Sequence, residues 1–290
     1  MPTRHDQLRP LPVPLGPVQG EILGSYLHRL AIVNNRPAFA LAELIAPLPQ
    51  EFSPLSNTTV RWTARSPHAL AVLTGRPPER LAKALPALAD FLNLAPGERR
   101  AGIIGRRCRS CMARRSPAAP MVITLNPVHR YVCYRHRAWT RTTHDLPLTR
   151  LPEVLRAQHQ LDRLARRHQA PSMAKALDTA HKVVDEWALH GTPINVGDEW
   201  ARRLSHIAAE PVSRAVPTSD QRRLAAFPET VVLAELVLDA PEHNIEPKDL
   251  YLATTAELSR RLSRSYTTLG IQDPLFQHLC NTQTGLDESQ

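Results

Sequence analysis

Long apolar runs are missing from this sequence. The best of them, from Val231 to Leu238, is interrupted by Glu235, whereas a transmembrane helix needs about 20 predominantly apolar residues. The stretch from Met1 to Pro17 is rich in proline and contains no apolar segment of the kind that directs export. We therefore expect a protein that has no membrane partner and works in the reducing cytoplasm.

Glycine is scarce as well, whereas proline is abundant. Of the 290 residues, 11 are glycine and 27 are proline, which is about twice the average proline usage. Proline fits the first turn of a helix but not its interior, so the composition predicts many short helices with proline near their starts. With 42% apolar and 22% charged residues, the chain is globular and long enough for two or three modest cores.

Cysteine is rare, yet three of the four cysteines lie in one short region. Two residues separate Cys108 from Cys111, and two separate Cys133 from His136. Paired ligands at this spacing are typical of tetrahedral zinc sites, and clustered thiols in a reducing compartment bind metal more often than they form disulfides. Four ligands leave no open position, so we predict one structural Zn²⁺ per chain. Cys280 is interpreted as a packing residue.

Two strands are predicted between the ligand pairs. Residues 121–125 form a run rich in β-branched side chains, 126–127 (Asn-Pro) is a turn signal, and 128–133 alternates toward the second pair. This order predicts a zinc ribbon, with a β-hairpin between two knuckles. His129 competes with His136 for the fourth ligand position, but it lacks the knuckle spacing and is interpreted as a strand residue. Trp139 is interpreted as a packing residue.

Negative charge almost disappears around the ligands. Residues 99–150 contain twelve arginines, no lysine and one acid, Asp145, which gives +11 against +9 for the whole chain. Such a concentration is typical of a protein that binds the phosphate backbone of nucleic acid. The chain has 32 arginines and four lysines, so a genomic arginine bias would explain arginine over lysine but not the missing acids. We predict duplex-DNA contacts through Arg106, Arg107, Arg109, Arg114, Arg115, Arg135 and Arg137, with a merely solvated basic face as the alternative.

Helical periodicity accounts for most of the remaining chain. Leu23, Leu27 and Leu30 mark the inner face of a helix over 21–34, and a second short helix is predicted over 37–46. Further helices are predicted around 151–164, from an N-cap at Ser172 to 191, around 200–207, and over 219–239 with a break at Pro228. The fold class is therefore mainly α, a multi-module helical protein with a small central zinc ribbon. Its predicted parts are an extended proline-rich leader (1–19), an N-terminal helical module (20–98), the ribbon (99–147) and a C-terminal helical module (148–290).

One pair of short predicted helices has the dimensions of a helix-turn-helix. Ser66 and Pro67 open the first helix, Gly75 ends it, and a second helix follows within three residues. The second helix offers few groups that could read bases, namely Arg76, Arg80 and Lys83. A DNA-reading role and plain helical packing both remain open for this pair.

Catalytic motifs do not accompany the metal ligands. The His-x-Glu and Pro-Cys-x-x-Cys elements of zinc deaminases are missing from the sequence, as are the phosphate-binding P-loop, the His-Glu-x-x-His helix and the Gly-x-Ser-x-Gly turn. We therefore predict a protein that is not an enzyme. A nuclease built on a zinc ribbon, with His144 and Asp145 as a metal-and-base pair, is kept as an alternative.

Several segments together resemble the TniQ family. Its opening signature is resembled by 11–14 (LPVP), 20–31 (GEILGSYLHRLA) and Asn34, and its next segment by 70–75 (LAVLTG), Leu81 and 84–86 (ALP). The two knuckles resemble the family's zinc finger, and 151–153 (LPE) with 157–158 (AQ) resembles the stretch that follows it. The usual Gly-Glu-Ser, Cys-Pro-x-Cys and Cys-Pro-x-His are Gly-Glu-Ile, Cys-Arg-Ser-Cys and Cys-Tyr-Arg-His here, so the ligands are kept. The resemblance covers about residues 10–165.

The resemblance implies a role in transposition, a form of DNA recombination. Proteins of this kind, related to TnsD, are target-selection adaptors that bind DNA or a DNA-recognising partner and recruit a AAA+ regulator and a transposase. It also implies that the N-terminal region contacts a partner, with Glu21, Tyr26 and Arg29 as candidates; the alternative is that these residues only brace the fold. We predict a non-catalytic, zinc-containing, DNA-binding adaptor. Other readings are a protein-interaction scaffold, a stand-alone cellular DNA-binding factor, and the nuclease.

Overall fold

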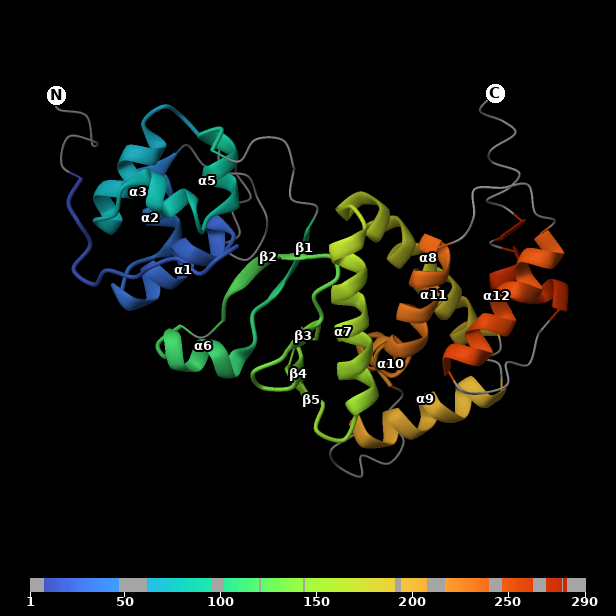
Figure 1. Cartoon of the computed structure of the whole chain (residues 1–290). Helices are drawn as coiled ribbons and strands as arrows, with labels where there is room; N and C mark the ends of the chain where they lie inside the picture. Colours follow the sequence, from blue (N-terminus) through green and yellow to red (C-terminus); the bar gives the residue numbers. More distant parts are fainter. Residues whose placement is uncertain are drawn as a thin grey trace, which may run out of the picture. The chain divides into compact units, whose positions relative to one another are not determined.

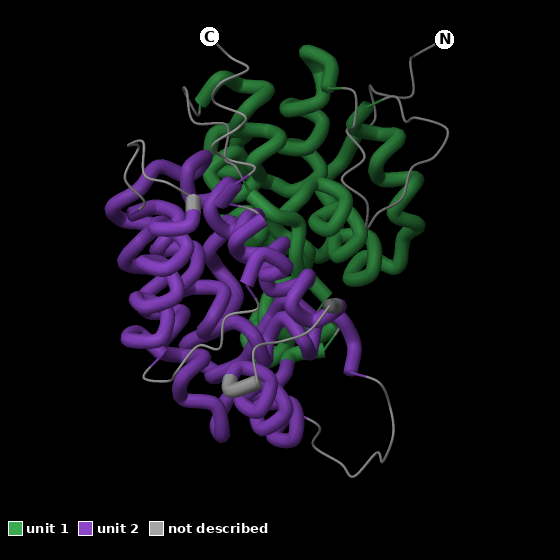
Figure 2. The backbone as a smooth tube through the Cα atoms, turned by 90° about the vertical axis from the view of Figure 1, so that its right-hand side faces the viewer, with its two compact units in different colours: residues 1–127, 143–145 green, residues 128–142, 146–290 purple. Residues whose placement is uncertain are grey.

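In the computed structural model, the chain is mainly helical, which confirms the predicted fold class (Figure 1). The structure describes residues 8–46, 62–94, 102–119, 121–142, 144–190, 194–207, 217–239, 247–262, 270–277 and 279–280. The chain divides into two compact units, one of residues 1–127 and 143–145, the other of 128–142 and 146–290 (Figure 2). The four segments expected from the sequence remain a prediction.

In the described part of the first unit, short helices precede a two-stranded sheet whose strands are joined through a further helix. The helices are α1 (Leu23–Val33), α2 (Ala38–Ile45), α3 (Ser66–Thr74), α4 (Pro78–Ala82) and α5 (Pro86–Phe91), and β1 (Gly102–Arg106), α6 (Arg109–Arg115) and β2 (Ile123–Pro127) follow. Leu23, Leu27 and Leu30 are buried in the core that these helices share, as predicted. Gly75 ends α3 with a left-handed φ of 65°, a conformation that glycine adopts without steric cost. The helix pair is thus confirmed, and its DNA-reading role stays a prediction.

The predicted hairpin between the knuckles is wrong. Strand β2 forms as expected, but it pairs antiparallel with β1, from Gly102 opposite Pro127 to Arg106 opposite Ile123. The segment after residue 127 pairs with strands that follow it in the sequence. Strand β3 (Val132–Cys133) lies against β4 (Ala138–Trp139), and β4 lies against β5 (Leu146–Pro147). Each ligand pair therefore sits at the connection between two antiparallel strands. His129 lies in a turn before β3 rather than in a strand.

The second unit is a helical core onto which the β3–β4 hairpin packs. Its helices are α7 (Pro152–Arg167), α8 (Ala170–His190), α9 (Ile194–Ile207), α10 (Ser219–Ala225), α11 (Phe227–Asp239), α12 (Pro247–Leu262) and the short η1 (Gly270–Gln272). Trp139 is 1% exposed, stacks on Tyr131 with ring centroids 5.1 Å apart, and meets the edge of Phe227 at 4.9 Å. The packing role predicted for Trp139 is confirmed.

Two predicted helix boundaries in this unit need correction. Helix α8 begins at Ala170, so Ser172 lies inside its first turn and is not the N-cap; Pro171 fits this early position because no intrahelical partner is lost there. The break within 219–239 falls at Ala226, two residues before Pro228, which lies in the first turn of α11. Both differences follow from the tolerance of helix starts for proline.

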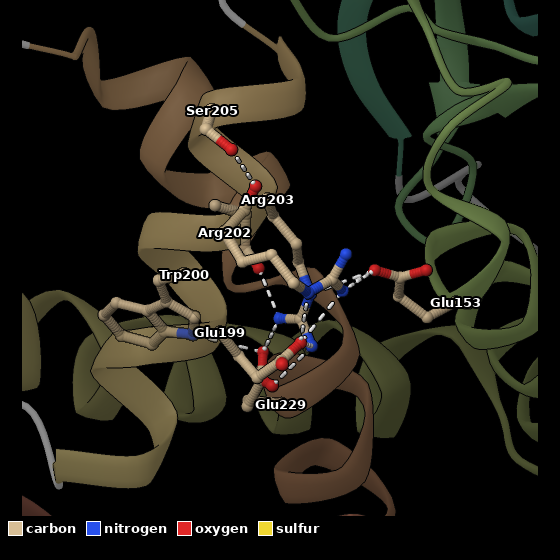
Figure 3. A network of polar contacts seen from close by, with 8 residues as sticks. Glu153, Glu199, Trp200, Arg202, Arg203, Ser205 and Glu229 are labelled. Carbon is tan, nitrogen blue, oxygen red and sulfur yellow. Dashed lines mark hydrogen bonds and ion pairs between the residues drawn. The ribbon is translucent and has the colours of Figure 1, made fainter.

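An ionic network with a buried centre joins α7, α9 and α11 (Figure 3). Arg203 donates to both carboxylate oxygens of Glu229, at 2.6 and 2.9 Å, and the Trp200 indole also donates to Glu229 at 3.1 Å. Arg202 bridges Glu199 and Glu153 beside it. Each charge of the network has an opposite charge within reach, which is what buried ions require. The network therefore connects α9 both to α11 and to the start of α7.

Candidate metal centre

Three thiols and one imidazole form a compact cluster of the kind that could hold a metal ion. One ligand atom each from Cys108, Cys111, Cys133 and His136 lies within 4.8 Å of all the others. The Cys133 Sγ and His136 Nδ1 atoms are 3.7 Å apart. Two ligands held at about 2.3 and 2.1 Å from one tetrahedral ion would be about 3.6 Å apart, so this spacing fits. The cluster could hold a metal ion, and His136 rather than His129 is its histidine.

The first ligand pair is positioned by the start of α6. Cys108 immediately precedes the helix, and Met112 donates its backbone N–H to the Cys108 carbonyl at 3.1 Å. The Arg109 N–H donates to Asp145 Oδ2 at 2.7 Å, so an acidic side chain satisfies one of the donors left open at the helix start. Beneath the helix, Met112 is 2% exposed and, within the described part of the chain, forms a small buried cluster with Val18 and Val122.

The Asp145 contact bears on the nuclease alternative. The His144 Nδ1 atom lies 3.2 Å from Arg109 Nη1, so both members of the suspected catalytic pair contact Arg109. A carboxylate that caps a helix and a ring that meets a guanidinium are explained by packing alone. The geometry thus favours a structural role for His144 and Asp145.

The second ligand pair is positioned by a tight turn that α7 supports. Arg137 closes the turn with a left-handed φ of 45°, and Tyr134 projects onto α7, where its ring stacks on His159 with centroids 4.6 Å apart. The Tyr134 hydroxyl donates to Asp162, and burial together with this hydrogen bond raises the pKa of the phenol above its ordinary value. The side chain of Gln158 holds the preceding loop, by accepting from the Tyr131 N–H at 3.0 Å and donating to the His129 carbonyl at 2.8 Å.

The arginines predicted to contact DNA differ in exposure. Arg106 and Arg107 are half-buried, and Arg107 donates to the Gln19 carbonyl at 2.7 Å. The exposed ones are Arg109, Arg114, Arg115, Arg135 and Arg137. Arg114 and Arg115 lie in the last turn of α6, where positive charge is favoured by the helix dipole. The sequence could not separate these two groups, because exposure depends on packing.

The three residues predicted to contact a partner lie inside the first unit. Glu21, Tyr26 and Arg29 are 0%, 0% and 1% exposed. The Arg29 guanidinium donates to both Glu21 oxygens at 2.8 and 2.6 Å, and the Tyr26 hydroxyl donates to the Leu15 carbonyl; burial raises the Tyr26 pKa above its ordinary value. This geometry favours the alternative in which they brace the fold.

One residue of this brace was missed from the sequence. Ser25 donates its hydroxyl to Glu21 at 2.9 Å and accepts the Ile123 N–H at 3.0 Å, which ties α1 to β2. Its spacing was a usable signal, because Ser25 and Arg29 lie four residues apart on one face of α1, and Glu21 lies four residues before Ser25. Among the described residues, no helix combines the length and apolar character that crossing a membrane requires.

Comparison with known proteins places the chain in a family. No curated protein and no solved structure matches it. A family model with the description TniQ matches residues 12–269, which is nearly the whole chain and includes both ligand pairs. The chain belongs to the TniQ family, a family of adaptors associated with transposition.

Proposed function

We propose that this protein is a non-catalytic adaptor that binds zinc and duplex DNA in the reducing cytoplasm, and so connects a DNA target to transposition machinery. The observation that carries this proposal is a four-ligand cluster set among twelve arginines and one acid over 99–150. Family membership supports a AAA+ regulator and a transposase as its protein partners.

The donor set favours zinc over other metals. Thiolates with an imidazole are the ligands that tetrahedral zinc prefers, whereas Ca²⁺ and Mg²⁺ prefer oxygen. All four positions are taken by Cys108, Cys111, Cys133 and His136, so bound zinc would act as a structural cross-link without an open coordination site. Three thiolates with one neutral imidazole give the loaded site about one net negative charge, which hardly reduces the surrounding positive charge.

Exposed arginines at the end of α6 support the part of the proposal that concerns DNA binding. Arg114 and Arg115 form no hydrogen bond or ion pair with other described residues, so their guanidinium groups are available for phosphate oxygens, which they bind as bidentate forks. Arg135 and Arg137 present two more exposed charges at the second knuckle. Contacts of this kind fix affinity with little base readout.

Neutralising Arg114 and Arg115 tests this surface. We expect Arg114→Gln with Arg115→Gln to weaken binding to all duplex sequences alike and to flatten the slope of log K against log salt by nearly two, since each phosphate contact contributes about 0.9. The measurement is fluorescence anisotropy with labelled duplexes. The matched control, Arg36→Gln with Arg65→Gln, removes the same charge from exposed positions of the same unit. Equal effects of the two double variants would contradict contact through α6.

A further inference from the structure

A row of basic side chains follows the exposed face of α7. Its five members are all exposed: Arg156, His159, Arg163, Arg166 and Arg167. The first four follow one another at intervals of three or four residues, and the last two are adjacent. This spacing puts them along one side of the helix. The opposite side carries Val154, Ala157, Leu161 and Leu164, which are buried in the core of the second unit. The row is therefore held on a rigid, well-packed element.

Three arginines of this row have no counter-charge. Elsewhere in the unit, Arg202, Arg203, Arg223, Arg260 and Arg261 each pair with a carboxylate. Arg167, at the end of the row, pairs with Glu235 at 3.2 Å. In contrast, Arg156, Arg163 and Arg166 form no hydrogen bond or ion pair with any described residue. Acids thus accompany six other arginines of this unit but not these three.

The same unpaired arginines of α7 also line two shallow depressions in the surface. Two adjoining hollows lie along α7, and both are lined by Gln160, Arg163 and Arg166. Arg156 and His159 complete one hollow; Arg167 and Glu235 complete the other. Apart from Glu235 at one end, the lining carries only basic or neutral side chains. Anionic groups of a ligand would meet several donors at once there.

The basic row continues onto the second knuckle, within the same unit. The Tyr134 ring stacks on His159 at 4.6 Å, and the Arg130 guanidinium lies 5.8 Å from the centre of the Tyr134 ring. Arg130 is itself exposed. Basic and aromatic groups thus run from the metal-ligand turn to the C-terminal part of α7.

We propose that Arg156, Arg163 and Arg166 bind the phosphate backbone of duplex DNA, as a second DNA-contacting surface in addition to the arginines of residues 106–137. The proposal deepens the proposed function and rests on it. From Arg156 to Arg166 the helix rises about 15 Å, which corresponds to about four phosphates of one strand at 3.4 Å along the duplex axis. The row therefore matches a stretch of backbone rather than a single anion.

Duplex DNA fits this surface better than an acidic protein does. The centre of a protein interface is rich in apolar and aromatic side chains, yet α7 supplies none of the exposed large apolar residues found in the described chain. Planar guanidinium forks match phosphate oxygens, and uncompensated arginines without apolar neighbours are what a phosphate-contacting surface needs. A row this polar gives electrostatic affinity without base readout.

The test neutralises the row in the full-length chain. We expect Arg156→Gln, Arg163→Gln and Arg166→Gln together to flatten the slope of log K against log salt by about 2.7 and to weaken duplex binding at 0.1 M salt by at least about tenfold. Glutamine is a good helix former, so circular dichroism should show the wild-type helix content. The control triple, Arg36→Gln, Arg65→Gln and Arg222→Gln, removes the same charge from exposed positions outside α7.

Each outcome decides the proposal. Wild-type behaviour of the α7 triple variant, or an effect equal to that of the control triple, would overturn it, and the proposed function would stand if the Arg114 and Arg115 variant still lost binding. Unchanged duplex binding combined with lost binding to poly-glutamate would assign α7 to an acidic protein partner and also overturn it. A wild-type chain that fails to bind duplex DNA would overturn both proposals together.

Discussion

Cys111→Ser is expected to lose the bound zinc and to release the first ligand pair from its folded position. A structural zinc site contributes on the order of 10 kcal/mol to folding. Few other interactions stabilise the structure around the first ligand pair. Helix α6 has seven residues and covers a cluster of three buried residues, whereas isolated helices shorter than about 12 residues are marginal in water. The second pair should suffer less, because Tyr131 and Trp139 anchor its hairpin in a large core.

Elemental analysis and hydrogen exchange together measure this effect. Wild-type protein should contain one zinc per chain, and the variant should contain little, with faster amide exchange over 108–116 than over 131–139. Cys280→Ser is the matched control, because Cys280 lies outside the cluster, and it should retain the metal. Wild-type protein without zinc, or full zinc content and unchanged exchange in Cys111→Ser, would contradict a structural metal held by these four residues.

Arg29→Met is expected to lower the free energy of unfolding of the first unit by about 3–5 kcal/mol. The substitution keeps an apolar stem but leaves the Glu21 carboxylate buried without its partner, and breaking one side of a buried ion pair costs about this much. Glu21 would retain the Ser25 hydroxyl and the Val18 N–H as donors, which do not neutralise its charge. Adding Glu21→Gln should recover part of the loss, since removing both charges is tolerated better than removing one.

Urea unfolding, followed by circular dichroism, measures the loss. Arg36→Met, at an exposed position, is the control and should change stability by no more than about 0.5 kcal/mol. If Arg29→Met kept wild-type stability but lost binding to a AAA+ partner, the residue would serve an interface, and the bracing role assigned to it here would be wrong.

The cluster that could hold a metal ion was predictable from the sequence because the spacing within each pair is local. Two intervening residues between Cys108 and Cys111, and again between Cys133 and His136, specify a knuckle whatever the rest of the chain does. The helices of 21–34 and 37–46 were equally accessible, since apolar periodicity and flanking proline act over a few residues. Their observed bounds differ from the predicted ones by one or two residues.

Strand pairing could not be predicted in the same way. The segment Gly102–Arg106 holds two glycines in five residues and gives a weak strand signal, yet its backbone provides the ladder that β2 needs. The turn signal at 126–127 suggested a hairpin, but Pro127 ends β2 opposite Gly102 instead. Which strand pairs with which depends on tertiary contacts that short sequence windows do not contain.

Burial is the other property that the sequence left open. Arg29 and Glu21 look like surface residues by composition, because charged side chains are rarely buried unless paired, and only the structure shows their pairing. The basic row of α7 is hidden in the sequence for a different reason. Acids are interspersed among the basic residues after residue 150, so an uncompensated arginine is recognised only once the ion pairs are known.

The dependence of duplex affinity on salt tests the central claim most directly, namely that exposed arginines of a zinc-stabilised protein bind DNA phosphates. The zinc-loaded chain is titrated with a labelled mixed-sequence duplex from 50 to 200 mM salt. About five phosphate contacts around the metal ligands give a slope of log K against log salt of −4 to −5, and contacts from α7 make it steeper. A slope of −4 or steeper is the predicted result, and a slope near zero would contradict the account.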